Sequence, residues 1–384
     1  MEFALSAEQE AFRTEIREFL ARELTDQTPI EDGWITGFSR EFSQKLGARG
    51  WIGLTWPKQY GGQEKTYLDR LILTEELLRA GAPVAAHWLG DRQVGPALLA
   101  YGSEEQKAAI LPRVTRGEVV FCLGMSEPGS GSDLASLRTK AVEEGDHFSL
   151  SGQKIWTSFA HVADYAYLVA RTDPDAPKHK GISEFMVDMQ TPGIEVRPLV
   201  DITGEHHFNE VFFDNVKVPH EWLIGEKNRG WYQIASQLDY ERSGIERLLS
   251  NYPLFRDAVA YAKHTGQAKD PLVRNRLAEM HIELELGRSM VYRVAWMLTQ
   301  GGIPNYEAAM AKCYCTEVEQ RIADAVSGLL GDYAVLMPDS PAARLAGRAA
   351  REYLYAPAYT IQGGTSNVLR NIMAIRGLGL QPGR

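Results

Sequence analysis

The sequence predicts an α+β fold in which a segment of β-strands lies between two helical segments. Residues 1–119 carry helical patterns, residues 120–226 carry short apolar runs punctuated by glycine and proline, and residues 227–384 are helical again. Strands that are grouped in one stretch, rather than alternating with helices, are typical of α+β proteins. A chain of 384 residues is long enough for these segments to be three domains, and we predict domain boundaries at the ranges given.

The first helical segment begins with a pattern typical of a capped amphipathic helix. Ser6 stands at the expected N-cap, and Glu8 and Glu10 fall in the first turn, where the helix dipole favours anions. Apolar side chains then recur every four residues from Phe12 to Leu20, which predicts one buried stripe. Glycine-rich breaks further along separate the helices that follow.

The middle segment contains short runs with strand composition, bounded by turn residues. Residues 143–146 (Glu-Glu-Gly-Asp) separate two such runs, as the turn of a hairpin would. The sequence therefore predicts a compact β domain here. Its clearest predicted strands are Tyr165–Val169, Phe185–Val187, Ile194–Val196 and Val211–Phe213.

The last segment reads as helices interrupted by glycine and proline, and it offers no metal site. Cys313 and Cys315 are one residue apart, which does not match the spacing of a zinc knuckle, and we interpret them as helix residues. In the middle segment, adjacent His206 and His207 cannot readily share one ion, so we interpret them as part of a loop.

Composition and charge exclude several classes of protein. The net charge of −9 disfavours a nucleic-acid binder, which needs a basic surface, and an anionic membrane as partner. Three cysteines give no disulfide framework and favour a reducing compartment. Neither a signal-peptide pattern nor an apolar run of about 20 residues is visible, so we expect a cytoplasmic protein.

A glycine-rich segment at residues 126–133 invites a nucleotide-binding interpretation. The Rossmann fingerprint requires a third glycine that opens a helix, but Leu134 stands at that position and the following residues alternate like a strand. This mismatch disfavours the classical dinucleotide fold. Taken alone, a loop rich in glycine and serine is more often a simple turn.

Three segments together make the chain similar to the acyl-CoA dehydrogenase family. Residues 126–133, 151–158 and 212–219 resemble signatures of that family in matching order, and the resemblance covers essentially the whole chain. It implies an N-terminal helical domain, a middle β-barrel-like domain and a C-terminal four-helix bundle. It also implies an FAD cofactor and an electron-transfer flavoprotein as the electron acceptor.

The resemblance assigns residues to the flavin. An indole can cover a ring face by stacking, and hydroxyl groups can reach the flavin N5 and O4 atoms. The residues implied along the ring are Leu123, Met125, Ser126, Trp156 and Ser158. Thr365 and Asn367 begin the last predicted helix, where free amides suit a flavin phosphate. Without the resemblance, Trp156 reads as a core aromatic and Thr365 as a helix cap.

The catalytic base cannot be the one that many family members use. Their glutamate lies in a C-terminal Tyr-Glu-Gly-Thr segment, where this sequence has Gly363, which cannot accept a proton. A minority, including isovaleryl- and long-chain-type enzymes, carries the glutamate on an earlier helix before an arginine, as Glu241 precedes Arg242 here. The resemblance implies that Glu241 abstracts the α proton while the β hydride goes to flavin N5, which gives the trans-2-enoyl-CoA. Without the resemblance, Glu241 reads as one glutamate on a solvated helix.

The substrate contacts follow from the same resemblance. Asp239 and Arg242 resemble residues that meet coenzyme A, and their alternative interpretation is a surface ion pair. Ser132 is expected on the coenzyme A side. The amide of Gly363 is expected to donate to the thioester carbonyl, and its missing side chain to leave room for a bulky acyl group.

Two departures from the family favour a second subunit. Residues 263–271 lack the Arg-x-x-Phe-Gly motif, and residues 327–332 retain little of the Gln-x-x-Gly-Gly-x-Gly motif; in homotetrameric members both reach a neighbouring subunit's flavin. The chain thus resembles the heteromeric actinobacterial enzymes that shorten steroid side chains. This implies an α2β2 assembly and a bulky, ring-bearing acyl-CoA. The alternatives are self-assembly, a non-catalytic partner subunit and an acyl-CoA oxidase.

Overall fold

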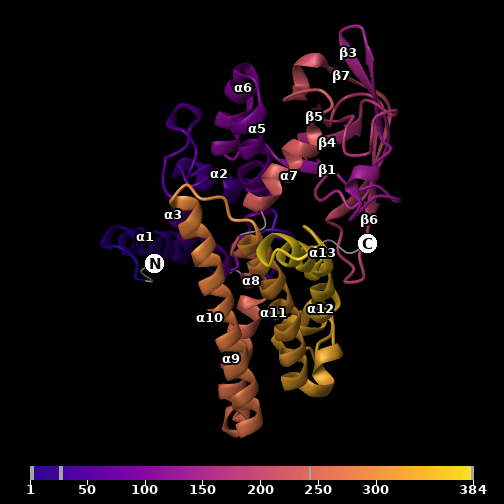
Figure 1. Cartoon of the computed structure of the whole chain (residues 1–384). Coiled ribbons are helices and arrows are strands. Elements are labelled where there is room, and N and C mark those ends of the chain that lie inside the picture. Colours follow the sequence, from indigo (N-terminus) through magenta and orange to yellow (C-terminus); the bar gives the residue numbers. More distant parts are fainter. Residues whose placement is uncertain (1–3, 26–28, 242–243, 382–384) are drawn as a thin grey trace. The chain divides into compact units, whose positions relative to one another are not determined.

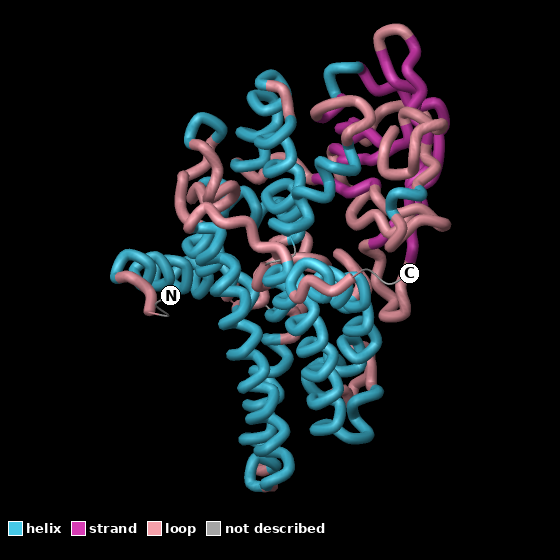
Figure 2. The backbone as a smooth tube through the Cα atoms, viewed as in Figure 1, coloured by secondary structure: helices cyan, strands magenta, loops and turns pink. Residues whose placement is uncertain are grey.

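The computed structural model describes residues 4–25, 29–241 and 244–381, and side chains 236–243 are outside this description. The chain forms two compact units, and each combines segments that are distant in sequence. The first unit contains Met1–Gly37, Thr66–Pro83 and Arg242–Arg384, and the second contains Phe38–Lys65 and Val84–Glu241. The elements follow the predicted order along the chain, with helices first, then strands, then helices again. Figure 2 distinguishes the helices from the strands by colour.

The first unit is helical. Helix α11 contacts α9, α10 and α12 in the C-terminal bundle (Figure 1), and α3 contacts both α1 and α10. Two N-terminal helices therefore pack with the C-terminal ones, while the predicted three-domain boundaries remain a prediction. The helices are α1 (Ala7–Glu23), α3 (Tyr67–Arg79), α8 (Glu246–Leu249), α9 (Tyr252–Thr265), α10 (Pro271–Thr299), α11 (Tyr306–Leu330), α12 (Arg348–Tyr355) and α13 (Ser366–Ile372).

The predicted cap of the first helix is confirmed. Ser6 is the N-cap of α1, its hydroxyl accepts from the amide of Gln9 at 3.2 Å, and the Gln9 side chain accepts from the Ser6 amide in return. This reciprocal pair satisfies two amides that the start of a helix leaves free. Ile16 and Leu20 are buried on the predicted apolar face.

The second unit is built on an eight-stranded sheet. The strand order is β6-β7-β3-β2-β4-β5-β8, and β1 pairs in parallel with β4. The predicted hairpin at residues 143–146 is confirmed, because Glu144 pairs with His147 where β2 meets β3. The strands are β1 (Phe121–Gly124), β2 (Lys140–Glu144), β3 (His147–Lys154), β4 (Tyr165–Arg171), β5 (Ile182–Asp188), β6 (Ile194–Leu199), β7 (Phe208–Pro219) and β8 (Leu223–Ile224), so the four predicted strands are confirmed.

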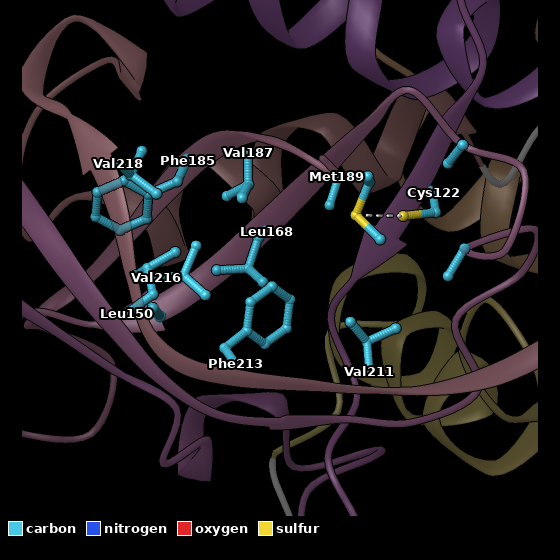
Figure 3. Packing of buried hydrophobic residues seen from close by; sticks show 14 of the residues in the cluster. Cys122, Leu150, Leu168, Phe185, Val187, Met189, Val211, Phe213, Val216 and Val218 are labelled. Atoms are coloured by element: carbon cyan, nitrogen blue, oxygen red, sulfur yellow. Dashed lines mark hydrogen bonds between the residues drawn. The ribbon is translucent and has the colours of Figure 1, made fainter. Parts of the chain in front are cut away.

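A cluster of buried apolar side chains forms the core of the sheet. Side chains from β1, β3, β4, β5 and β7 converge in it (Figure 3), and each large aliphatic side chain that is buried contributes about 1.5–3 kcal/mol. The Cys122 thiol points at the Met189 sulfur, 3.9 Å away. Burial raises the pKa of Cys122 to about 12, so this thiol is an unreactive packing group.

Helices of the second unit are tied to the sheet by polar side chains. Arg40 of α2 forms an ion pair with Asp164 at 3.0 Å, and Gln106 of α6 donates to the Leu223 carbonyl at 2.9 Å. The helices are α2 (Arg40–Ala48), α4 (Ala85–Leu89), α5 (Gly95–Tyr101), α6 (Glu104–Thr115) and α7 (Gly230–Glu241). Within the described residues, no helix is long and apolar enough to cross a membrane.

Candidate active site

One group of predicted site residues lies in the second unit, on two loops that the structure brings together. Strand β1 leads into the loop that carries Met125 and Ser126, and β3 leads into the loop that carries Trp156 and Ser158. The carbonyl of Ser126 accepts from the amide of Ile155 at 3.0 Å. This bond places the two segments that resemble family signatures side by side. Leu123, Met125, Ser126 and Ser158 are half-buried.

A buried ion pair, which the sequence analysis missed, holds these loops together. The Lys154 side chain is fully buried, and its amino group donates to Glu127 at 2.9 Å and to the Met125 carbonyl at 3.0 Å. Glu127 also accepts from the amides of Arg138 and Thr139. Burial lowers the pKa of Lys154 to about 8. Burial acts to raise the pKa of Glu127, but the pairing with Lys154 prevails and lowers it.

The Trp156 side chain is largely exposed to solvent instead of being packed in a core. Its backbone is left-handed, with a φ of 59°, and 54% of the residue is exposed, while its ring meets Phe208 edge-on at 5.6 Å. A left-handed backbone costs a residue of this kind about 1–3 kcal/mol and is a feature of functional sites. The neighbouring Thr157 hydroxyl is buried and has no hydrogen-bond partner among the described residues. An exposed indole beside an unsatisfied hydroxyl fits a planar polar ligand such as a flavin ring.

The glycine-rich loop is open to solvent, and one expectation about it is wrong. Ser132 is exposed, and the neighbouring Asp133 forms an exposed ion pair with Lys178 at 3.0 Å. The residues after Asp133 do not continue as a strand. Leu134–Ser136 form a 3-10 turn, because the carbonyls of Asp133 and Leu134 accept local backbone bonds, and β2 begins only at Lys140.

Helix α7, which carries the predicted base, is fixed to the sheet at its start. The Gln233 amide nitrogen donates to Glu184 of β5 at 2.6 Å and to the Ile224 carbonyl of β8 at 3.2 Å. The last residue of α7 is Glu241. The side chains of Asp239 and Glu241, together with Arg242, lie outside the described residues, so their predicted roles remain predictions.

The second group of predicted residues lies in the first unit, around Gly363. The backbone there is left-handed, with a φ of 64°, and a Cβ atom would lie 2.8 Å from a guanidinium nitrogen of Arg247. Arg247 is buried and packs over the Trp34 ring, 4.8 Å from its centroid. Glycine is thus favoured here by the left-handed backbone, and any side chain would also have to displace the Arg247 guanidinium. The space beside Gly363, which we expected an acyl group to use, contains the Arg247 guanidinium.

The start of the last helix combines a cap with an unsatisfied amide. Thr365 is the N-cap of α13, and its hydroxyl accepts from the Val368 amide at 3.2 Å, so the helix-cap interpretation is confirmed. Asn367 is exposed. The Gln362 side-chain nitrogen is buried, and no acceptor for it is found among the described residues. A buried donor without a partner, three residues before the N-cap of this helix, fits a polar ligand group.

The described residues contain no candidate site for a metal ion. Across the described ranges, no three His, Cys, Asp or Glu side chains are grouped to hold one. His206 instead stacks on His161 at 4.4 Å and pairs with Asn209 at 2.9 Å.

Comparison with known families gives first the class of protein, a flavin-dependent oxidoreductase, and then the particular family. Models of the N-terminal, middle and C-terminal domains of acyl-CoA dehydrogenases match residues 6–118, 122–216 and 228–378. The chain belongs to the acyl-CoA dehydrogenase family, whose members are flavin enzymes.

Similar proteins include several from actinobacteria. Acyl-CoA dehydrogenase FadE26 of Mycobacterium tuberculosis is 34% identical over 99% of both chains, and acyl-CoA dehydrogenase IpdE1 of the same organism is 34% identical over 97% of both. The solved Tcur3481-Tcur3483 steroid ACAD has a TM-score of 0.92 at 35% identity and covers 100% of both chains. The ChsE4-ChsE5 complex from Mycobacterium tuberculosis has a TM-score of 0.88 at 34% identity over 100% of both chains.

Proposed function

We propose that this chain is the catalytic subunit of a cytoplasmic acyl-CoA dehydrogenase and that Glu241 removes the α proton of the substrate. The observation that carries the proposal is the environment of Gly363. Gly363 has no side chain that could take the proton, and a guanidinium nitrogen of the buried Arg247 lies 2.8 Å from where a Cβ atom would stand, so the base must come from another residue. Glu241, at the end of α7, is the residue that resembles the alternative base of the family.

The Gly363 amide would make the α proton of the substrate easier to remove. The Gly363 amide makes no hydrogen bond to any other described residue, so it is available to donate to the thioester oxygen. Donation to that oxygen stabilises the negative charge that develops when the α proton leaves, by about 2.7–4 kcal/mol for one well-placed donor. Glu241 would then hold the proton on its carboxylate.

The residues present fit FAD. Trp156 and the unsatisfied Thr157 hydroxyl suit its ring, with Leu123, Met125, Ser126 and Ser158 beside them on the same two loops. Thr365 and Asn367, at the start of α13, would face its phosphate. When bound, FAD supplies the acceptor for the hydride that leaves the β carbon, and an electron-transfer flavoprotein would then accept the electrons.

The substrate is proposed to be a bulky, ring-bearing acyl-CoA, and the assembly an α2β2 complex with a second acyl-CoA dehydrogenase-like chain. The support comes from two similar structures that each combine two chains, one of which is named a steroid ACAD. The coenzyme A portion would contact Ser132, Asp239 and Arg242.

The first test is the variant Glu241→Gln, assayed for bleaching of the flavin absorption by acyl-CoA, with the partner subunit present. Because general base catalysis contributes about 10²–10⁴-fold, we expect the rate to fall by at least about a hundredfold while FAD remains bound. Glu285→Gln, which changes an exposed glutamate of α10, is the matched control and should retain the rate. An unchanged rate in Glu241→Gln would favour the alternative of a non-catalytic partner subunit.

A further inference from the structure

Helix α11 holds the loop that carries Gly363. Lys312 is buried, and its amino group donates to the Tyr359 carbonyl at 3.1 Å and to the Gly364 carbonyl at 2.6 Å. Two turns further along α11, the Gln320 side chain donates to the Thr360 hydroxyl at 3.0 Å. One amino group thus joins two carbonyls that lie on either side of Gly363.

The loop needs such a constraint because of its sequence. Gly363 and Gly364 both have left-handed backbones, with φ values of 64° and 97°. Glycine has more conformational freedom to lose than any other residue, and fixing one residue costs about 1–2 kcal/mol. Two successive glycines would sample many orientations of their amides unless a contact selected one. The hydrogen bond from the Lys312 amino group to the Gly364 carbonyl supplies that contact.

The other carbonyl that accepts from Lys312 belongs to Tyr359, whose side chain is buried and hydrogen-bonded. The Tyr359 ring is 1% exposed, and its hydroxyl bonds to Asp32 and to Glu352, the latter at 3.2 Å. Burial raises the pKa of both Tyr359 and Asp32. Because Tyr359 is anchored at both its ring and its carbonyl, Lys312 ties Gly364 to a fixed point in the helical unit.

We propose that Lys312 is a positioning residue, which sets the orientation of the Gly363 amide by joining the carbonyls of Tyr359 and Gly364. The inference rests on the proposed function, in which that amide donates to the thioester oxygen. A donor that is misplaced by about 1 Å can cost about a hundredfold in rate, so a distant clamp of this kind affects catalysis without touching the substrate.

The test is Lys312→Met, measured first by amide hydrogen exchange of residues 359–366 in the FAD-loaded complex with the partner. Loss of both bonds should loosen the loop and speed exchange at Ile361 and Gln362, whose amides donate to the Ala358 carbonyl, by at least about tenfold. The control is Thr316→Val, one turn along α11, because the buried Thr316 hydroxyl donates to the Lys312 carbonyl at 2.8 Å and remains within its own helix. Exchange of the loop should not change in this control.

The second readout separates positioning from a general loss of stability. At a temperature where all variants are folded, Lys312→Met should slow bleaching of the flavin at saturating acyl-CoA by about ten- to a hundredfold, with little change in the KM. Lys312→Gln retains two N–H donors and should recover part of the rate, and it replaces the methionine variant if the latter does not fold.

Each outcome decides between the two proposals. Loop exchange that is equal in wild type and Lys312→Met would overturn the role of Lys312, whatever the activity. Faster exchange with an unchanged bleaching rate would also overturn it. A wild-type complex that never bleaches its flavin would refute the proposed function and with it the catalytic role of Lys312, while faster exchange in Lys312→Met would still show that Lys312 fixes the loop.

Discussion

Two physical causes disfavour a side chain at position 363, the left-handed backbone and the close approach of Arg247, and their costs can be measured separately. Gly363→Ala would place a Cβ atom 2.8 Å from the Arg247 guanidinium and would keep a left-handed backbone. We expect the free energy of unfolding to fall by the backbone cost of about 1–2 kcal/mol plus the cost of displacing Arg247 from the Trp34 ring. Urea denaturation measures the total.

A matched glycine isolates the backbone cost. Gly301 has a φ of 77°, and a Cβ atom there would meet no atom within 4 Å. Gly301→Ala should therefore lose only the backbone cost. If both alanine variants lost the same free energy, the close approach of Arg247 to Gly363 would contribute nothing.

The buried pair of Lys154 and Glu127 gives a second prediction for single residues. Lys154→Met removes the cation but leaves a carboxylate that is 9% exposed, which costs about 3–5 kcal/mol in measured cases. We expect the free energy of unfolding to fall by that amount and the affinity for FAD to weaken, because Met125 loses its contact with Lys154. Thermal unfolding and flavin titration measure the two effects.

The exposed pair of Lys178 and Asp133 provides the control, since Lys178→Met should cost under about 1 kcal/mol. In the double variant Lys154→Met/Glu127→Gln, the single amide oxygen can replace only one of the two carboxylate oxygens that accept from Arg138 and Thr139, but no unpaired charge remains buried, so part of the stability should return. A double variant as unstable as Lys154→Met alone would show that the buried carboxylate is not the cause.

At the scale of helices and strands, sequence patterns correctly predicted helix caps and a tight turn. Ser6, the hairpin at residues 143–146 and Thr365 were found because a cap or a tight turn depends on a few consecutive residues. The neighbour of Gly363 was not predictable, because Arg247 lies on a separate helix, and a glycine in a sequence does not say what occupies the space beside it. Lys154 stands at an inward position of β3, on the same side as Phe148 and Leu150, and this alternation was a signal that could have been used.

The junction of β5 with α7 predicts a dependence on pH. Burial raises the pKa of Glu184 to about 7 from an ordinary value of 4.5, so between these pH values the folded state binds more protons than the unfolded state. The free energy of unfolding should therefore fall as the pH rises from 4.5 to 7, and this carboxyl alone should contribute a loss of about 3 kcal/mol.

Glu184→Gln removes that titration and keeps an acceptor for Gln233, whose amide nitrogen now donates to Glu184 at 2.6 Å. The measurement is urea unfolding of both proteins across this pH range. The wild type should lose stability relative to the variant as the pH rises. A difference that stayed constant with pH would show that the pKa of Glu184 in the folded protein is not raised above its ordinary value.

At the scale of the whole molecule, the chain is more interleaved than its sequence order suggests. Helices α1 and α3 belong to the same compact unit as the C-terminal helices, while α2 and α4–α6 belong with the sheet. An amphipathic pattern predicts that a helix has a buried face but not which partner covers it. The order of helices and strands was therefore predictable, whereas their grouping required coordinates.

The predicted second subunit can be tested on the whole molecule. Residues 263–271 and 327–332 lack the motifs with which homotetrameric members complete a neighbour's flavin site. We therefore expect the chain purified alone to retain less than one FAD per chain. Co-expression with a second acyl-CoA dehydrogenase-like chain from the same source should give an α2β2 complex with a stable flavin content.

Light scattering gives the mass of each species, and absorbance gives its ratio of flavin to protein. A stable homotetramer of this chain with one FAD per subunit would contradict the prediction, because the altered segments would then be able to complete a neighbouring site.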